Sequence, residues 1–134
     1  MKTLEVVRQL LEPIPEIRLA YVFGSMARGE ARLQSDLDLA WLTEPPLTLG
    51  QESLVVDRLE RATGREVQVI DLWRAPPLLL AEIVREGVPV VCRDETEQAL
   101  FEGRAIARYL DTDHLRRVQH VYLRERALHY GAQA

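Results

Sequence analysis

The sequence predicts a single α/β domain, and three observations support that prediction. The chain has 134 residues, which is long enough to bury one hydrophobic core. Short apolar segments rich in branched and aromatic residues alternate with longer segments that have the spacing of amphipathic helices. Glycines and prolines fall between these segments, where turns are expected. We therefore expect one domain over 1–134, with a core over about 3–93 and a helical tail over about 95–130.

The first part of the chain predicts a helix followed by two strands. Thr3 caps a helix that reaches Leu11, and two prolines shortly afterwards end it. The run IRLAYVF over 17–23 is apolar and rich in branched and aromatic residues, which predicts a buried strand. A second strand is expected over 35–42, because the paired prolines at 45 and 46 break the chain after it.

The rest of the chain predicts two more strands and three helices. In order, they are a helix over 49–63, a strand over 66–72, a helix over 78–86, a strand over 88–92 and a long C-terminal helix. Gly64 and Gly87 end the first two helices. Asp94 and Glu97 have the spacing of a capping box at the start of the last helix.

Residues suited to binding and catalysis lie at the ends of the first two predicted strands. Gly24-Ser25 follows the first strand, where a sharp turn can present N–H groups and a hydroxyl to an anion. Asp36 and Asp38 are two residues apart on the second strand, so both carboxylates point to the same side. Such a pair is best explained by a bound cation, and oxygen ligands favour Mg²⁺. Taken separately, the two motifs fit an ordinary turn and a solvated strand; together they favour a nucleotidyl-transfer site.

The segment GSMARGEARLQSDLDLAWL resembles the signature of the DNA-polymerase-β-like nucleotidyltransferase superfamily. Within that superfamily, the chain is similar to the minimal nucleotidyltransferases (MNT) that are paired with HEPN toxins. The resemblance continues through VQVIDLWRAPPLLL and IVREGVPVVCR. It implies a polymerase-β palm-like fold, with a small mixed sheet, helices on one face and a long C-terminal helix.

The resemblance also implies roles for individual residues. Gly24 and Ser25 would grip the β- and γ-phosphates of ATP, while Asp36 and Asp38 would hold two Mg²⁺ ions as the catalytic carboxylates. Arg28 lies on the arm between these groups and is a candidate for binding the nucleotide phosphates. Arg32 has the same opportunity, although both arginines also suit an exposed surface.

One position departs from the family pattern. Gln68 stands on the third strand where active relatives place a third carboxylate, so it is a doubtful third metal ligand that cannot act as a base. Glu66 has the same strand parity but lies about 7 Å away along the strand. Asp71 has the opposite parity. Either acid would need a bulge or a long reach to compensate, and loss of a base lowers a rate by about 10²–10⁴-fold.

The resemblance implies a Mg²⁺-dependent protein adenylyltransferase, an antitoxin that moves AMP from ATP to a tyrosine of a HEPN ribonuclease toxin. With Gln68 in place of the acid, an alternative is neutralisation of the toxin by binding alone. A transferase for a small hydroxylated molecule is a third possibility, disfavoured by the missing acceptor domain. An apolar stripe along the tail offers a surface to a partner or to a second copy.

Composition bounds the remaining classes. The formal net charge is −4, so direct nucleic-acid binding is not expected. A single cysteine excludes a disulfide within the chain, and no signal peptide or membrane-length apolar run is present, which predicts a cytoplasmic protein. Trp41 and Trp73 follow strands and can stack on a base, but packing in the core or its rim is favoured.

Overall fold

The computed structural model describes residues 2–32 and 35–133; side chains at 112–116 and at several later positions of the last helix lie outside the description. The elements are α1 (Lys2–Leu11), β1 (Ile17–Phe23), β2 (Leu37–Thr43), α2 (Leu49–Thr63), β3 (Val67–Asp71), α3 (Pro77–Glu86), β4 (Val88–Cys92) and α4 (Glu95–Gln133). Every helix and strand that the sequence predicts is present, in the predicted order. β2 begins at Leu37, two residues later than predicted, and so leaves Asp36 just ahead of the strand. α1 already includes Lys2, so Thr3 lies inside the helix and the prediction that it caps the helix was wrong.

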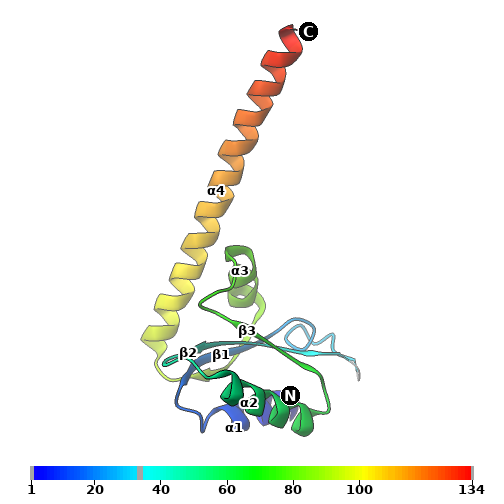
Figure 1. Ribbon diagram of the computed structural model, residues 1–134, viewed down its shortest axis with the longest axis vertical. Helices are drawn as coiled ribbons and strands as arrows, with labels where there is room; N and C mark the ends of the chain where they lie inside the picture. Colours follow the sequence, from blue (N-terminus) through cyan, green and yellow to red (C-terminus); the bar gives the residue numbers. More distant parts are fainter. Residues whose placement is uncertain (1, 33–34, 134) are drawn as a thin grey trace.

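The four strands form one mixed sheet in the order β3-β2-β1-β4. β1 is antiparallel to both β2 and β4, whereas β2 and β3 are parallel. The two central strands, β1 and β2, are the most deeply buried. This is the predicted small mixed sheet, and the end of β1 and the start of β2 lie together at one end of it (Figure 1).

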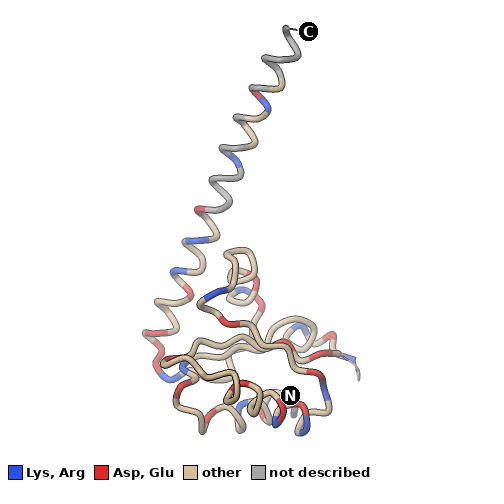
Figure 2. The backbone as a smooth tube through the Cα atoms, in the orientation of Figure 1, with Lys and Arg blue, Asp and Glu red and all other residues tan. Residues whose placement is uncertain are grey.

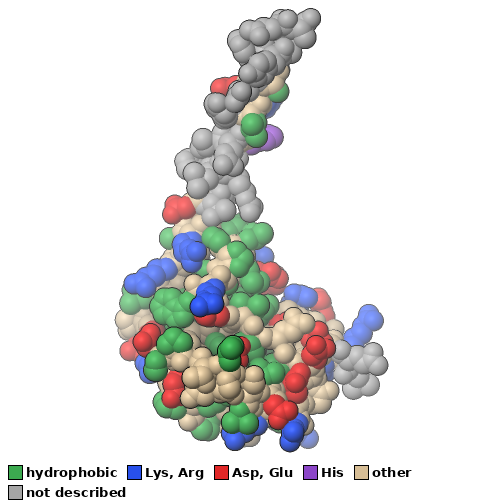
Figure 3. Space-filling model, viewed as in Figure 1, with side chains coloured by type: hydrophobic (Ala, Val, Ile, Leu, Met, Phe, Trp, Pro, Cys, Tyr) green, Lys and Arg blue, Asp and Glu red, His purple; other side chains and the backbone are tan. Residues whose placement is uncertain are grey.

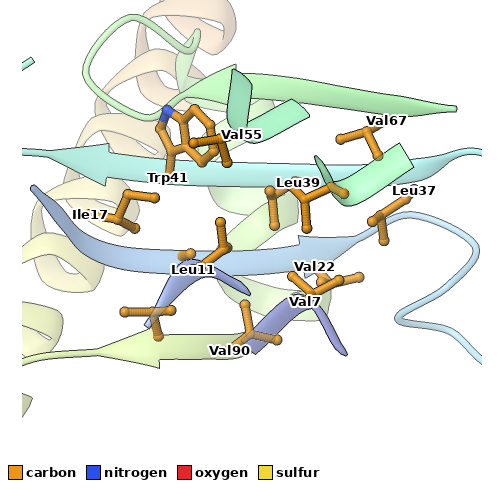
Figure 4. Close-up of a cluster of buried hydrophobic side chains, with 13 residues drawn as sticks. Val7, Leu11, Ile17, Val22, Leu37, Leu39, Trp41, Val55, Val67 and Val90 are labelled. Carbon is orange, nitrogen blue, oxygen red and sulfur yellow. The ribbon is translucent and has the colours of Figure 1, made fainter. Parts of the chain in front are cut away.

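Helices cover both faces of the sheet, whereas the sequence analysis placed them on one face; that detail was wrong. α1 and α2 pack on one face, and α3 with the first turns of α4 packs on the other (Figure 1). Figure 4 shows the first core, where Val7 and Leu11 of α1 meet Leu39 of β2. β1 and β2 are apolar on both sides, and a strand with two apolar faces needs cover on each. The second core includes Tyr21, Ala40 and Ile83.

α4 is fixed to the sheet at its base and then extends well beyond the domain (Figure 1). Arg18 of β1 pairs with Glu97 at 3.1 Å between Nη2 and Oε2. The buried Tyr21 hydroxyl donates to Glu102 Oε1 at 2.8 Å; burial first, and then this hydrogen bond, raise the pKa of Tyr21 far above its ordinary value. Because Glu97 is engaged by Arg18, the predicted capping box is only half formed: Asp94 Oδ1 accepts from the Thr96 N–H at 2.8 Å.

Acidic and basic positions are interspersed along the described backbone, as Figure 2 shows, in keeping with a net charge of −4. Among the described residues, no helix is both long enough and apolar enough to span a membrane.

Candidate active site

The predicted phosphate turn and carboxylates meet at one end of the sheet. Asp38 pairs in register with Phe23 of β1 on one side and with Gln68 of β3 on the other. Gly24 follows Phe23 directly, so the Gly24-Ser25 turn begins beside Asp38. Sequence reasoning therefore identified residues that the fold brings together from three strands.

Gly24 lies so close to Asp38 that a side chain at position 24 has no room. Its φ is 70°, in the left-handed region that glycine adopts most readily. A Cβ built there would collide with Asp38 Oδ2. The following turn is closed by the Arg28 N–H, which donates to the Gly24 carbonyl at 3.2 Å, and by the Glu30 N–H, which donates to Ser25 at 3.0 Å. The backbone of the turn is thus held against the carboxylate.

The charged form of the Asp38 carboxyl group is disfavoured at this site. Partial burial raises the pKa of its carboxyl, the nearby charge of Asp36 raises it further, and Arg28 opposes both effects. Two carboxylates held close together in this way are stabilised by a cation between them. The geometry thus suits positive charge at this end of the sheet.

Gln68 occupies the third position, as its place in the sequence predicted. Its Nε2 donates to Asp36 Oδ2 at 3.3 Å. Among the described residues, no group of three or more His, Cys, Asp or Glu side chains could hold a metal ion. Mg²⁺ is nevertheless commonly bound through one or two carboxylates, with substrate phosphates and water completing its shell. Asp36 and Asp38 fit that pattern as two carboxylate ligands, whereas Gln68 presents its amide N–H to Asp36, so its role as a third ligand stays a prediction.

The two acids that sequence reasoning weighed as substitutes differ in placement. Asp71 lies on the other face from Gln68, and its Oδ1 accepts from the Trp73 N–H at 2.9 Å, so it serves the turn after β3. Glu66 is exposed one pleat before Gln68 on the same side, with its carbonyl bonded to the Leu37 N–H at 2.8 Å. Asp71 is therefore unsuited to compensate, while a role for Glu66 stays a prediction.

The two arginines of the arm have different surroundings. Arg28 pairs with Glu30 at 3.1 Å and with Glu86 of α3 at 3.7 Å; the hydrogen bond to Glu30 is the main reason that the pKa of Arg28 is raised. Arg32 is exposed and has no side-chain ion pair within the described part of the chain. Arg28, near Asp38, is thus the better placed of the two for a phosphate.

Arg65 is a candidate positioning residue that sequence reasoning passed over. Its Nη1 donates to the carbonyls of Arg32, at 2.7 Å, and of Ser35, at 2.9 Å. The Ser35 hydroxyl in turn accepts from the Arg32 N–H at 2.8 Å. These bonds fix the chain immediately before Asp36 to the end of α2. The Gly-Arg pair at 64 and 65 was visible in the sequence, but carbonyl partners carry no side-chain signal.

We expect Arg65→Ala to weaken the binding of Mg²⁺ with a non-hydrolysable ATP analogue by about tenfold. The substitution removes the hydrogen bonds that hold the backbone immediately before Asp36. Arg65→Lys keeps a donor and should retain most of the affinity. Calorimetric titration of the purified variants measures both. Arg58→Ala on α2 is the matched control, and an Arg65→Ala affinity within twofold of wild type would contradict the assignment.

Asp36→Asn should stabilise the metal-free protein at neutral pH. A carboxyl whose pKa is raised on folding destabilises the folded state above its ordinary pKa, and this penalty disappears as the pH falls below that value. Asp36→Asn removes one charge that raises the Asp38 pKa. Its melting temperature in EDTA should therefore exceed that of wild type at pH 7, with the gain lost near pH 3.

The control for that experiment is Asp57→Asn, which breaks an exposed pair with Arg61 and should give no gain. A lower melting temperature for Asp36→Asn at pH 7 would show that the two carboxylates do not repel each other in the folded protein.

Trp41 and Trp73 lie away from this site. Trp41 is 3% exposed within the core, whereas Trp73 is 56% exposed. Trp73 follows the end of β3, at the opposite end of the parallel β2–β3 pair from Asp38 and Gln68. Packing, as the sequence analysis favoured, accounts for Trp41, and Trp73 is a rim residue.

Comparison with known proteins shows the family. Residues 5–96 match the family described as Polymerase beta, Nucleotidyltransferase. The chain belongs to this family. The nucleotidyltransferase is 27% identical over 105 residues to the protein adenylyltransferase MntA of Shewanella oneidensis, covering 78% of this chain and 75% of that protein. It is 31% identical over 97 residues to the probable protein adenylyltransferase MntA of Haemophilus influenzae, covering 69% and 81%. These matches place it among the MntA-type minimal nucleotidyltransferases, as the sequence resemblance indicated.

Solved structures confirm the fold of the nucleotidyltransferase. A toxin–antitoxin structure with AMP-PNP aligns over 100% of both chains with a TM-score of 0.69 and 24% identity. The MNT antitoxin in complex with a tri-AMPylated Shewanella oneidensis HEPN toxin aligns over 99% of this chain and 98% of that one, with a TM-score of 0.65 and 23% identity. Both likenesses include the long C-terminal helix as well as the core.

Proposed function

We propose that this nucleotidyltransferase is a Mg²⁺-dependent protein adenylyltransferase that moves AMP from ATP to a tyrosine of a HEPN ribonuclease toxin, and so acts as its antitoxin. The observation that carries the proposal is the packing of Gly24 against Asp38, with Asp36 and Gln68 beside them. The MntA relatives and the HEPN complex support the choice of reaction and partner.

In this proposal each part of the site has one task. The Gly24-Ser25 turn directs N–H groups and a hydroxyl toward the β- and γ-phosphates. Asp36 and Asp38 would hold the metal ions, and Gln68 keeps Asp36 oriented through its amide N–H. The chemistry that bound Mg²⁺ supplies is neutralisation of charge on the triphosphate and the departing pyrophosphate. The tyrosine oxygen bonds to the α-phosphorus as the bond to pyrophosphate breaks, and the phenolic proton passes to solvent.

The amide at position 68 fits a phenolic acceptor. A glutamine cannot take a proton from the attacking hydroxyl. A tyrosine hydroxyl has a pKa of about 10, so it needs less help from a base than an aliphatic hydroxyl does. The loss of the third carboxylate is thus better tolerated when the acceptor is tyrosine. A protein tyrosine is therefore favoured over a sugar hydroxyl as the acceptor.

The test uses the purified protein, a HEPN-domain protein from the same genome, ATP and Mg²⁺, with both chains weighed intact by mass spectrometry. We expect stepwise AMP additions to a tyrosine of the HEPN protein. Asp36→Ala/Asp38→Ala should abolish them, whereas Asp57→Ala on α2 should not. Unchanged masses with the wild-type protein, at concentrations where the two chains form a complex, would contradict the transferase.

Neutralisation by binding alone is the second candidate, and Gln68 is the observation that favours it. Only two of the three expected carboxylates are in the site. A complex that is stable with wild-type protein but unmodified would support this candidate.

Restoring the acid at position 68 should raise the transfer rate. We expect Gln68→Asp to increase the single-turnover rate of AMP transfer by about tenfold or more, because a carboxylate can both bind metal and accept a proton. Gln68→Asn is the matched control, since it shortens the side chain without adding charge. Quenched-flow measurement of labelled toxin gives the rates. A slower Gln68→Asp enzyme would show that the amide is adapted to its role here.

A further inference from the structure

A cavity lies at the base of α4. Figure 1 shows that the base of α4 is at the other end of the sheet from the turn between β1 and β2, where the candidate active site lies. The cavity has a volume of about 330 Å³ and an apolar floor, with Leu42, Leu72 and Leu80 below and Phe101 of α4 beside them. In the view of Figure 3, hydrophobic and basic side chains lie next to one another over this part of the molecule. None of the proposed catalytic residues lines the cavity.

Its rim carries two exposed apolar side chains, Trp73 and Leu100. Trp73 is 56% exposed, yet its Nε1 donates to the Thr43 carbonyl at 3.2 Å, which fixes the ring. Leu100 on α4 is 58% exposed across the cavity. An ordered tryptophan beside a concave apolar floor is the kind of anchor that dominates binding energy at protein interfaces.

Charged side chains of both signs line the cavity beside the apolar ones. Arg18, Arg104 and Arg108 line it, against Glu44 and Glu97. Arg18 and Glu97 neutralise each other at 3.1 Å, while the Arg104 side chain has no ion pair with any described residue. Arg104 is therefore a basic side chain on the rim that is available to an acidic group of a partner. Arginine is also enriched at interface hot spots, because it packs and pairs at once.

We propose that the Trp73 patch, consisting of Trp73, Leu100 and Arg104, docks an acidic segment of the HEPN toxin that carries a large apolar side chain. The proposal rests on the function given above, since it names a second contact with the same partner. The apolar side chain fills the cavity beside Trp73, and the acidic group meets Arg104. Because the patch is separate from Asp36 and Asp38, substitutions in it should change the affinity for the toxin without changing the binding of nucleotide and metal.

Two substitutions on the exposed rim test the docking. Leu100→Asp and Arg104→Glu should each weaken the complex with the HEPN protein at least tenfold by calorimetry, and raise its KM in AMP transfer to the same extent. The affinity for Mg²⁺ with AMP-PNP should stay within twofold of wild type. Leu54→Asp and Arg58→Glu are matched controls, because both are exposed on α2, on the opposite face of the sheet.

A spectroscopic readout tests the patch without a disruptive change. The chain has two tryptophans, one buried and one exposed, so 5-fluorotryptophan labelling gives two ¹⁹F signals. We expect the Trp73 signal, assigned with Trp73→Phe, to shift when the HEPN protein is added, and the Trp41 signal to stay in place.

The outcomes separate this inference from the proposed function. Patch variants that bind the toxin within twofold of wild type, together with an unmoved Trp73 signal, would overturn the docking site even if AMP transfer is intact. Weakened binding by the patch variants supports the docking site even if wild-type protein leaves the toxin unmodified. Failure of the wild-type protein either to bind or to modify the HEPN protein overturns both proposals.

Discussion

Replacement of Asp38 by asparagine is expected to abolish AMP transfer, with a loss on the order of 10³-fold or more. Asp38 is the residue on which the site converges: it pairs in register with Gln68 and lies beneath Gly24. The raised pKa of its carboxyl reflects burial next to Asp36, a cost that a bound cation offsets. An amide of the same shape keeps the packing but removes the charge that holds the metal. Single-turnover transfer to the HEPN protein and calorimetry with Mg²⁺ and AMP-PNP measure the effect.

Two acids outside the site serve as controls for this substitution. Asp71→Asn changes an acid on the adjacent strand that faces the opposite side of the sheet and bonds the Trp73 N–H. Asp57→Asn changes an exposed acid on α2. Both should keep activity within about threefold, since neither reaches the site. Loss of activity in Asp71→Asn equal to that in Asp38→Asn would mean that strand parity does not decide which acids act.

The central strands and the grouping of the candidate site residues could be predicted from the sequence, because local sequence patterns determine them. The run 17–23 is short and almost entirely apolar, which predicts a buried strand, and β1 has those bounds. Alternation along the next strand was enough to place Asp36 and Asp38 on one side. Strand alternation also predicted that Gln68 and Asp71 lie on opposite faces, and the pairing of β2 with β3 agrees.

Features that depend on contacts between distant segments could not be predicted from the sequence. The helices on the second face could not be assigned, since a strand that is apolar throughout does not say which helix covers which side. Arg65 bonds carbonyls that are 30 and 33 residues earlier in the chain, and any residue type supplies a carbonyl. Glu97 has the sequence spacing of a capping box, but its carboxylate forms an ion pair with Arg18 on β1. The Trp73 patch likewise depends on α4 lying beside the ends of β2 and β3.

Gly24→Ala is expected to be nearly as damaging as loss of the carboxylate itself, with transfer reduced on the order of 10²–10³-fold. The methyl group would collide with Asp38 Oδ2, so either the turn or the carboxylate must move. Both belong to the proposed site, and a displacement of about 1 Å there is enough for a loss of this size. The affinity for Mg²⁺ with AMP-PNP should fall together with the rate, because the displaced groups are those that bind the triphosphate and the metal.

Gly29→Ala isolates the cause, because Gly24 and Gly29 have the same φ of 70°. A Cβ at position 29 meets nothing within 4 Å, whereas one at position 24 meets Asp38. The two variants therefore share the backbone strain of a left-handed alanine, of about 1 kcal/mol, and differ in the collision. Gly29→Ala should lose some thermal stability and keep its transfer rate, while Gly24→Ala should lose both. Equal rates for the two variants would mean that strain in the turn, and not its contact with Asp38, is what alanine disturbs, and the close approach of Gly24 would then have no part in the chemistry.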